Sequence, residues 1–325
     1  MGGMWLLLQL VVLLVGAFHA AASFFFFSRG RFAVVWALAW VVATLLTVLV
    51  PHNSFGMAAF WVAVVLWNVW WMSLRPLGDR DWAPDVARQC TGTIEGDVLT
   101  MHDVRNFEWR SDDDFAERWE TRRYDLRELA TLDLFASYWM GPSIAHLILS
   151  FGFGTQGQLA FSIEIRRERG EAWSNWAGFF KVYELVTVAA DERDVVRVRT
   201  GVRGEDVYRY GIDASPEFIR RLLTAYVADC NDLAKRPRFY HTLSSNCTTQ
   251  IVRLVGAAGR SLPFGWGMIA SGHAPAYLYR KGILDVLDTV LPFARVRADA
   301  AISRRAKAVH EDPAFSVRIR ERARE

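Results

Sequence analysis

Three long apolar runs without a charged residue constrain what this chain can fold into. They extend over Met4–Phe27, Phe32–Val50 and Phe55–Leu74, and none contains Asp, Glu, Lys or Arg. A helix of about 20 residues spans the roughly 30 Å hydrocarbon core of a bilayer. The first run has no basic segment before it and two further runs follow it, so we interpret it as a retained membrane helix and not as a cleaved signal peptide. We therefore predict a three-helix transmembrane region over residues 1–75.

The composition changes after this region. Charged residues become frequent from Arg75 onward, and about 250 residues remain, enough for one large domain. The net charge is only +3 with acidic and basic residues intermixed, so we expect no nucleic-acid partner. Arginines are frequent in residues 295–325, which indicates a basic, exposed helical tail that either contacts anionic headgroups or is simply solvated. We predict a second domain over residues 76–325 that includes this tail.

The pattern of this second domain favours an α+β fold, with helices packed on an antiparallel sheet. It predicts a hairpin over residues 93–101 and strands over 146–153, 159–165, 182–189, 195–200 and 206–212. Helical spacing extends over residues 126–139 and 276–291. Ser215 and Pro216 have the N-cap and first-turn chemistry of a helix that ends near Leu233.

Cys247 occupies the start of another predicted helix. Ser245 or Asn246 before it suits the N-cap, which places the thiol in the first helical turn. Unpaired backbone N–H groups and the positive end of the helix dipole gather there and stabilise a thiolate. The alternative is a small buried side chain, because free cysteines are among the most buried residues.

His146 is the predicted base for this thiol, because it interrupts an apolar strand that precedes a four-residue turn. A hairpin turning near Thr155 places His146 opposite Glu164, whereas a slip of one residue exposes Glu164 on the other face. A carboxylate beside the imidazole would complete a Cys–His–acid set. Two alternatives stay open: Glu164 forms an ion pair with Arg166 or Arg167, or His241, near Cys247 in sequence, is the base.

The chain contains three cysteines, Cys90, Cys230 and Cys247. Their odd number and wide spacing indicate neither a disulfide framework nor a zinc site. A pairing of Cys90 with Cys230 would leave Cys247 free. We expect no metal and no cofactor.

Several stretches resemble the bacterial Lnb N-terminal periplasmic domain family. They cover most of residues 80–255: Arg80–Arg88, His102–Phe107, Ser137–Trp139, Ile144–Phe153, Ser162–Arg166, Gly178–Leu185, Asp191–Asp194, Gly204–Tyr208 and Asn246–Thr249. Three preceding membrane spans also resemble a common arrangement in this family.

The resemblance implies a fold and a chemistry. The family takes its name from a lipoprotein N-acyltransferase, and the order of an early His and a later Cys is similar to the permuted papain-type fold of lecithin:retinol acyltransferase and NlpC-type peptidases. It implies a catalytic set of Cys247, His146 and Glu164, with the Cys247 backbone and Asn246 supporting an oxyanion.

These features lead to three hypotheses. The first is a membrane-anchored thiol acyltransferase that takes an acyl chain from a phospholipid or lipoprotein through a Cys247 thioester. The second is a hydrolase of the same fold, acting on a lipid, an amide or a cell-wall peptide. The third is a non-catalytic membrane scaffold with a buried Cys247. The oligomeric state stays open.

The side of the membrane occupied by the domain is contested. Arg29 and Arg31 lie in the first link, and Arg75, Arg80 and Arg88 follow the third span, so the positive-inside rule favours a cytoplasmic domain. The family resemblance implies a periplasmic one. Because the charge bias is small, we predict a multi-pass protein of the bacterial inner membrane with a periplasmic domain.

Overall fold

The computed structural model describes residues 2–321, except 28, 29, 31, 51–53, 175, 264, 266–269 and 287–290. It contains two compact units that interleave along the chain. The first consists of Met1–Leu77, Ala172–Glu184 and Arg238–Thr242. The second consists of Gly78–Glu171, Leu185–Pro237 and Leu243–Glu325.

The first unit is built on three apolar helices, α1 (Gly2–Phe26), α2 (Ala33–Leu49) and α3 (Ser54–Ser73). Only α1 and α3, among the described residues, are long and apolar enough to cross a membrane. The helix α2 has 17 residues and therefore a length of about 25 Å, short of a core of about 30 Å. The prediction of three spanning helices is therefore corrected to two candidate spans.

Polar and aromatic contacts hold the first unit together. Asn68 of α3 donates a hydrogen bond of 3.0 Å to Nε2 of His19 in α1, and Nδ1 of His19 lies 2.8 Å from the Val15 carbonyl. Phe180 stacks on Phe25 with ring centroids 5.3 Å apart. Lys181 donates a hydrogen bond of 2.7 Å to the Trp71 carbonyl. The segment Ala172–Glu184 thus packs on the apolar helices although it lies a hundred residues later in the chain.

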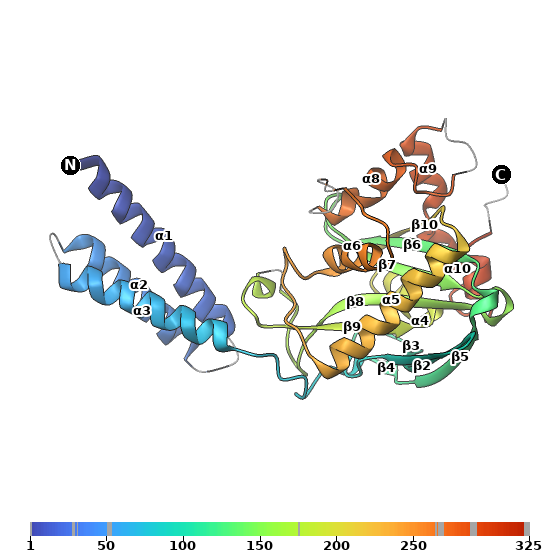
Figure 1. The fold of residues 1–325 in the computed structure, drawn as a ribbon, viewed down its shortest axis with the longest axis horizontal. Helices are drawn as coiled ribbons and strands as arrows, with labels where there is room; N and C mark the ends of the chain where they lie inside the picture. The colour runs from blue at the N-terminus through green and yellow to red at the C-terminus, as the bar shows by residue number, and fades with distance from the viewer. Residues whose placement is uncertain are drawn as a thin grey trace. The chain divides into compact units, whose positions relative to one another are not determined.

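The second unit contains a sheet in the order β1-β2-β9-β8-β7-β6-β10, with β5 paired to β2 (Figure 1). Its strands are β1 (Thr91–Glu95), β2 (Val98–Arg105), β5 (Trp119–Asp125), β6 (Thr131–Tyr138), β7 (Ala145–Gly152), β8 (Gln158–Arg166), β9 (Glu184–Ala190) and β10 (Asp206–Gly211). A two-stranded ribbon joins β3 (Glu108–Trp109) to β4 (Phe115–Ala116). The sheet is mixed and not antiparallel as predicted, because β2 and β9 pair in parallel through Arg105 and Ala190.

Helices cover both faces of this sheet. They are α4 (Glu192–Arg197), α5 (Pro216–Lys235), α6 (Cys247–Ala257), α8 (Ala274–Arg280), α9 (Phe293–Ala300), α10 (Ser303–Ala308) and α11 (Phe315–Arg318). On one face Tyr226 of α5 packs against Phe151 and Phe161. Ile148 is three residues from Phe151 in β7, so its side chain points to the other face of the sheet. There it joins Val195 of α4 in a core cluster. Figure 1 shows α5 crossing the strands at the front of the sheet.

Three segments differ from the predicted secondary structure. Residues 126–139 form one 3-10 turn (Leu126–Glu128) and then β6, whose residues after Thr131 are all buried. A strand buried on both faces lacks the alternation of apolar and polar residues by which a strand is recognised. Residues 195–200 are helical because Asp191 caps α4 by accepting a hydrogen bond from the Arg193 backbone. The helix predicted over 276–291 covers only Ala274–Arg280, and residues 287–290 lie outside the described part. The predicted start of α5, with Ser215 as N-cap and Pro216 in the first turn, is confirmed.

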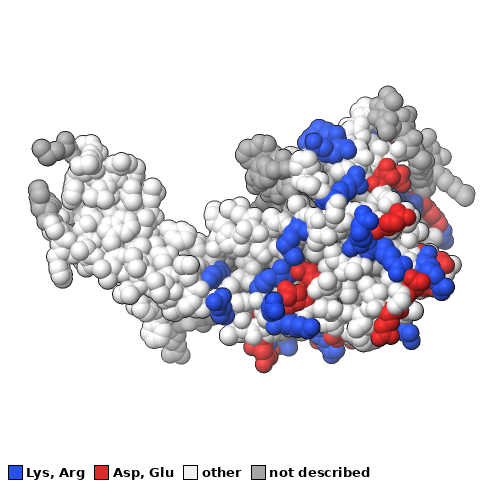
Figure 2. Space-filling view, viewed as in Figure 1, with Lys and Arg blue, Asp and Glu red and all other residues white. Residues whose placement is uncertain are grey.

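The C-terminal tail packs into the domain and is not the exposed helix that its charge suggests. Phe315 and Ile319 are only 1% and 0% exposed and belong to the core cluster that contains Ile148. Arg320 donates hydrogen bonds of 2.6 Å to Asp133 and to Glu192. On the face drawn in Figure 2, charged side chains of both signs intermingle over the second unit, whereas α1–α3 are uncharged.

Candidate active site

Cys247 is the first residue of α6, at the place where the sequence predicted it. Asn246 is the N-cap, and its side-chain oxygen accepts a hydrogen bond of 2.9 Å from the Thr249 backbone. The Thr249 hydroxyl accepts one of 2.9 Å from the Asn246 backbone, which completes a capping box. The Cys247 side chain is half-buried. The helix therefore begins in a fixed conformation with the thiol at its positive end.

His146 and Glu164 meet across two neighbouring antiparallel strands. The pairs Ile148–Ser162 and Leu149–Phe161 set the register of β7 and β8, and the same register places His146 opposite Glu164. Nε2 of His146 lies 3.2 Å from Oε1 of Glu164. The predicted register is thus confirmed, and the imidazole is only 8% exposed.

Ser162 forms a second link between these two groups. Its hydroxyl lies 2.7 Å from Nε2 of His146 and donates a hydrogen bond of 2.6 Å to Oε1 of Glu164. The arrangement requires a proton on Nε2, which Ser162 and Glu164 accept. Nδ1 is then the ring nitrogen that remains for the Cys247 thiol, and the imidazole is held in the tautomer and orientation that a base needs.

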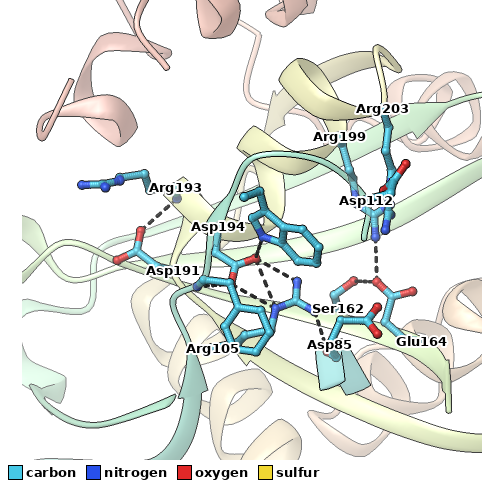
Figure 3. Close-up of polar contacts among 12 residues, drawn as sticks. Asp85, Arg105, Asp112, Ser162, Glu164, Asp191, Arg193, Asp194, Arg199 and Arg203 are labelled. Carbon is cyan, nitrogen blue, oxygen red and sulfur yellow. Dashed lines mark hydrogen bonds and ion pairs between the residues drawn. The ribbon is translucent and has the colours of Figure 1, made fainter. Parts of the chain in front are cut away.

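Arg199 is a third partner of the same carboxylate oxygen (Figure 3). It projects from a π-helical turn, Val198–Val202, and donates a hydrogen bond of 2.6 Å to Oε1 of Glu164. Neither of the two predicted ion-pair partners occupies this place. Arg166 donates to the carbonyls of residues 86 and 87, and Arg167 pairs with Asp85.

The electrostatics of the site favour a charged pair of thiolate and imidazolium. Burial alone would lower the pKa of His146, but the charge of Glu164 and the hydrogen bonds with Cys247 and Glu164 outweigh burial and the opposing charge of Arg199, and raise it to about 9. Burial would raise the pKa of Cys247, yet the hydrogen bond and charge of His146, with a hydrogen bond from the Leu147 backbone, lower it. Burial likewise opposes ionisation of Glu164, but His146 and Arg199 hold the pKa of its carboxyl well below its usual range.

The second candidate for the base is His241. The ring of His241 packs edge-on against Phe179, with centroids 5.8 Å apart, within the first compact unit. The imidazole that lowers the pKa of Cys247 is that of His146. The structure thus brings together Cys247, His146 and Glu164 and leaves their catalytic role as a prediction.

An apolar cavity of about 80 Å³ lies in the second unit, on the face of the sheet that carries Leu147 and Leu149, opposite to the His146 side chain. Leu147 and Thr248, the chain neighbours of His146 and Cys247, line it. Further lining comes from Leu149 of β7, Leu222 of α5 and Val252 of α6. The surface inside the cavity is apolar.

Two residues of the site, Ser162 and Arg199, were not predicted from the sequence. Ser162 precedes Glu164 by two residues on one strand, so the period of two could have placed it on the same face. Arg199 arrives from a turn 35 residues later, and nothing local to it points to Glu164. Among the described residues, no group of three or more His, Cys, Asp or Glu side chains is placed to hold a metal ion.

The comparisons with known proteins agree with the resemblance seen in the sequence. A family model described as the Lnb N-terminal periplasmic domain matches residues 115–278, half of the chain. The matched region contains Cys247, His146 and Glu164, and all but the first two of the stretches that carry the resemblance. No curated protein and no solved structure matches the chain significantly.

Proposed function

The chain belongs to the Lnb N-terminal periplasmic domain family, and from this membership and the Cys247–His146–Glu164 geometry we propose that it is a membrane-anchored thiol acyltransferase. Family and apolar helices together indicate a periplasmic domain attached to a membrane. The proposal adds that the chain crosses the bacterial inner membrane more than once and adopts a permuted papain-like fold.

The observation that carries this proposal is the His146–Glu164 pair, 3.2 Å apart, together with a thiol at the start of α6 whose pKa the His146 imidazole lowers. In the first step the Cys247 thiolate attacks the carbonyl carbon of an acyl ester. The ester C–O bond then breaks, the alcohol leaves with the proton of His146, and a thioester remains on Cys247. An amine attacks this thioester, His146 takes its proton, and the C–S bond breaks to give an amide and the free thiolate.

The backbone of α6 is the proposed site for the oxyanion. Helices leave their first N–H groups without an intrahelical acceptor, and the N–H of Cys247 lies at that position. The carbonyl oxygen of the Asn246 side chain is occupied by the cap. We therefore assign Asn246 the task of fixing the turn, with the Cys247 backbone as the donor.

The cavity supports an acyl substrate over a cell-wall peptide. The backbone N–H and C=O groups of a bound peptide need hydrogen-bond partners, whereas a hydrocarbon chain needs only an apolar surface. The cavity lined by Thr248, the neighbour of Cys247 in the chain, offers the second kind of surface. Phospholipids and lipoproteins carry acyl esters of this kind, and a membrane anchor gives access to both.

Intact mass spectrometry of the full chain, purified in detergent and incubated with diacyl phospholipid, tests the proposal. We expect an acyl adduct that maps to Cys247 and disappears when a primary amine is added, together with the acylated amine. Cys247→Ala should form no adduct. Acyl transfer by Cys247→Ala would exclude the thioester, and release of free fatty acid without transfer to the amine would make the protein a hydrolase.

A further inference from the structure

The two remaining cysteines, outside the proposed catalytic set, form a close pair. Cys90 directly precedes β1, and Cys230 lies in α5, 140 residues later. Their sulfur atoms are 3.0 Å apart, closer than van der Waals contact. The distance is about 1 Å longer than a disulfide bond of about 2.05 Å. Both side chains are 0% exposed.

The backbone on either side of this pair is fixed by hydrogen bonds. The side chain of Gln89 donates to the carbonyls of Cys90 and Cys230, at 3.0 and 3.4 Å. Asn231 exchanges hydrogen bonds of 2.9 and 2.7 Å with the backbone of Gly92. The residues next to each cysteine thus tie the same two segments together, which leaves the sulfur atoms facing each other in one place.

We propose that Cys90 and Cys230 form a disulfide bond in the mature protein. Each thiol gives up its hydrogen, so two protons and two electrons leave as the S–S bond forms. The electrons pass to the disulfide of an oxidising protein by thiol–disulfide exchange through a mixed disulfide. Such oxidants act in the periplasm, the compartment that the family name assigns to this domain.

The burial of both sulfur atoms fixes when this step occurs. An oxidising protein cannot reach a fully buried thiol, so the exchange takes place before α5 packs against β1. The bond then links two segments across most of the domain. It also consumes the only other thiols of the chain, so that Cys247 has no cysteine with which to form an unproductive disulfide.

Acid quenching of cells, followed by N-ethylmaleimide labelling in denaturant without reductant, tests the proposal on the full chain. Without reductant, we expect one alkylated cysteine per chain, Cys247. Reduction of this labelled protein should then raise its mass by two hydrogens. Non-reduced peptide mapping should join the Cys90 and Cys230 peptides. Cys247→Ala should take up no label and keep the joined peptides.

The opposite result is equally clear. Label on both Cys90 and Cys230 in the trapped sample would overturn the proposal, because the pair would then be reduced in the cell. The measurement does not depend on activity, so the disulfide and the acyl transfer proposed above fail or succeed separately. The double variant Cys90→Ser, Cys230→Ser provides the control for the joined peptides, and if it folds, its midpoint of thermal unfolding should fall by about 5–10 °C.

Discussion

Oε1 of Glu164 lies 3.2 Å from Nε2 of His146, and the two residues occupy facing positions on β7 and β8. Because the strands fix both backbones, this contact needs no loop to close before it forms. The carboxylate orients the imidazole and favours its protonated state. A thiol beside such an imidazole loses its proton more easily than an isolated one.

The first prediction concerns the reactivity of the three thiols. The lowered pKa of Cys247 means that its thiolate persists below the pH at which an ordinary thiol, with a pKa of about 8.5, is protonated. Alkylation of native protein by iodoacetamide should therefore have a pH midpoint below about 8.5 at Cys247. Cys90 and Cys230 serve as internal controls and should stay unlabelled because they are buried. A midpoint of 8.5 or higher at Cys247 would favour the non-catalytic scaffold.

The second prediction concerns the pH dependence of transfer. With Cys247 titrating low and His146 at about 9, the reactive ion pair exists between the two pKa values. The value of kcat/KM should rise as the thiolate forms and fall as the pH passes about 9, because deprotonated His146 cannot protonate the leaving alcohol. The two limbs report the coupled pair and not either residue alone. A profile that keeps rising above pH 10 would contradict the role of His146 as acid.

A third prediction follows from the neutral isostere Glu164→Gln. Loss of the negative charge removes the main influence that raises the pKa of His146, so the upper limb of the pH profile should move below 9. Transfer should fall by about 10²-fold or more, the usual contribution of an oriented acid–base group. Glu128→Gln, on an exposed residue, is the matched control and should leave the profile unchanged. An unchanged profile in Glu164→Gln would remove Glu164 from the catalytic set.

The fourth prediction concerns the apolar cavity lined by Thr248 and Val252. Val252→Phe places a larger side chain on its wall, at a half-buried position. We expect the KM for long-chain donors to rise about tenfold, whereas donors with short acyl chains should be used as before. Val252→Leu is the conservative control. Equal effects on long and short donors would show that the cavity does not hold the acyl chain.

The last prediction concerns the side of the membrane. An alkaline phosphatase fused after residue 325 should be active, because that enzyme needs disulfides that form in the periplasm. A reporter that works only in the cytoplasm should be inactive at the same junction. The reverse pattern would follow the positive-inside rule and would exclude exported lipoproteins as substrates of this protein.

Local sequence signals are sufficient for part of the site and insufficient for the rest. The cap at Asn246 and the register of a hairpin with a short turn depend on neighbours in the chain, so Cys247 and the facing of His146 and Glu164 were predictable. Arg199 reaches Glu164 only through tertiary packing. No local sequence pattern marks its π-helical turn, so residues 195–200 were predicted as a strand. The strand β6 was mistaken for a helix because it is buried on both faces.

The core cluster behind the sheet contains Ala83 and Val86 near the start of the domain and Phe315 and Ile319 near the end of the chain. More than 200 residues are synthesised between these two segments, so the core cluster cannot assemble until synthesis of the chain is nearly complete. If the domain is exported, its last helix must pass through the secretion channel before the core can close. Export would then precede folding, and chaperones would have to keep the unfolded domain from aggregating until its C-terminal segment has crossed the membrane.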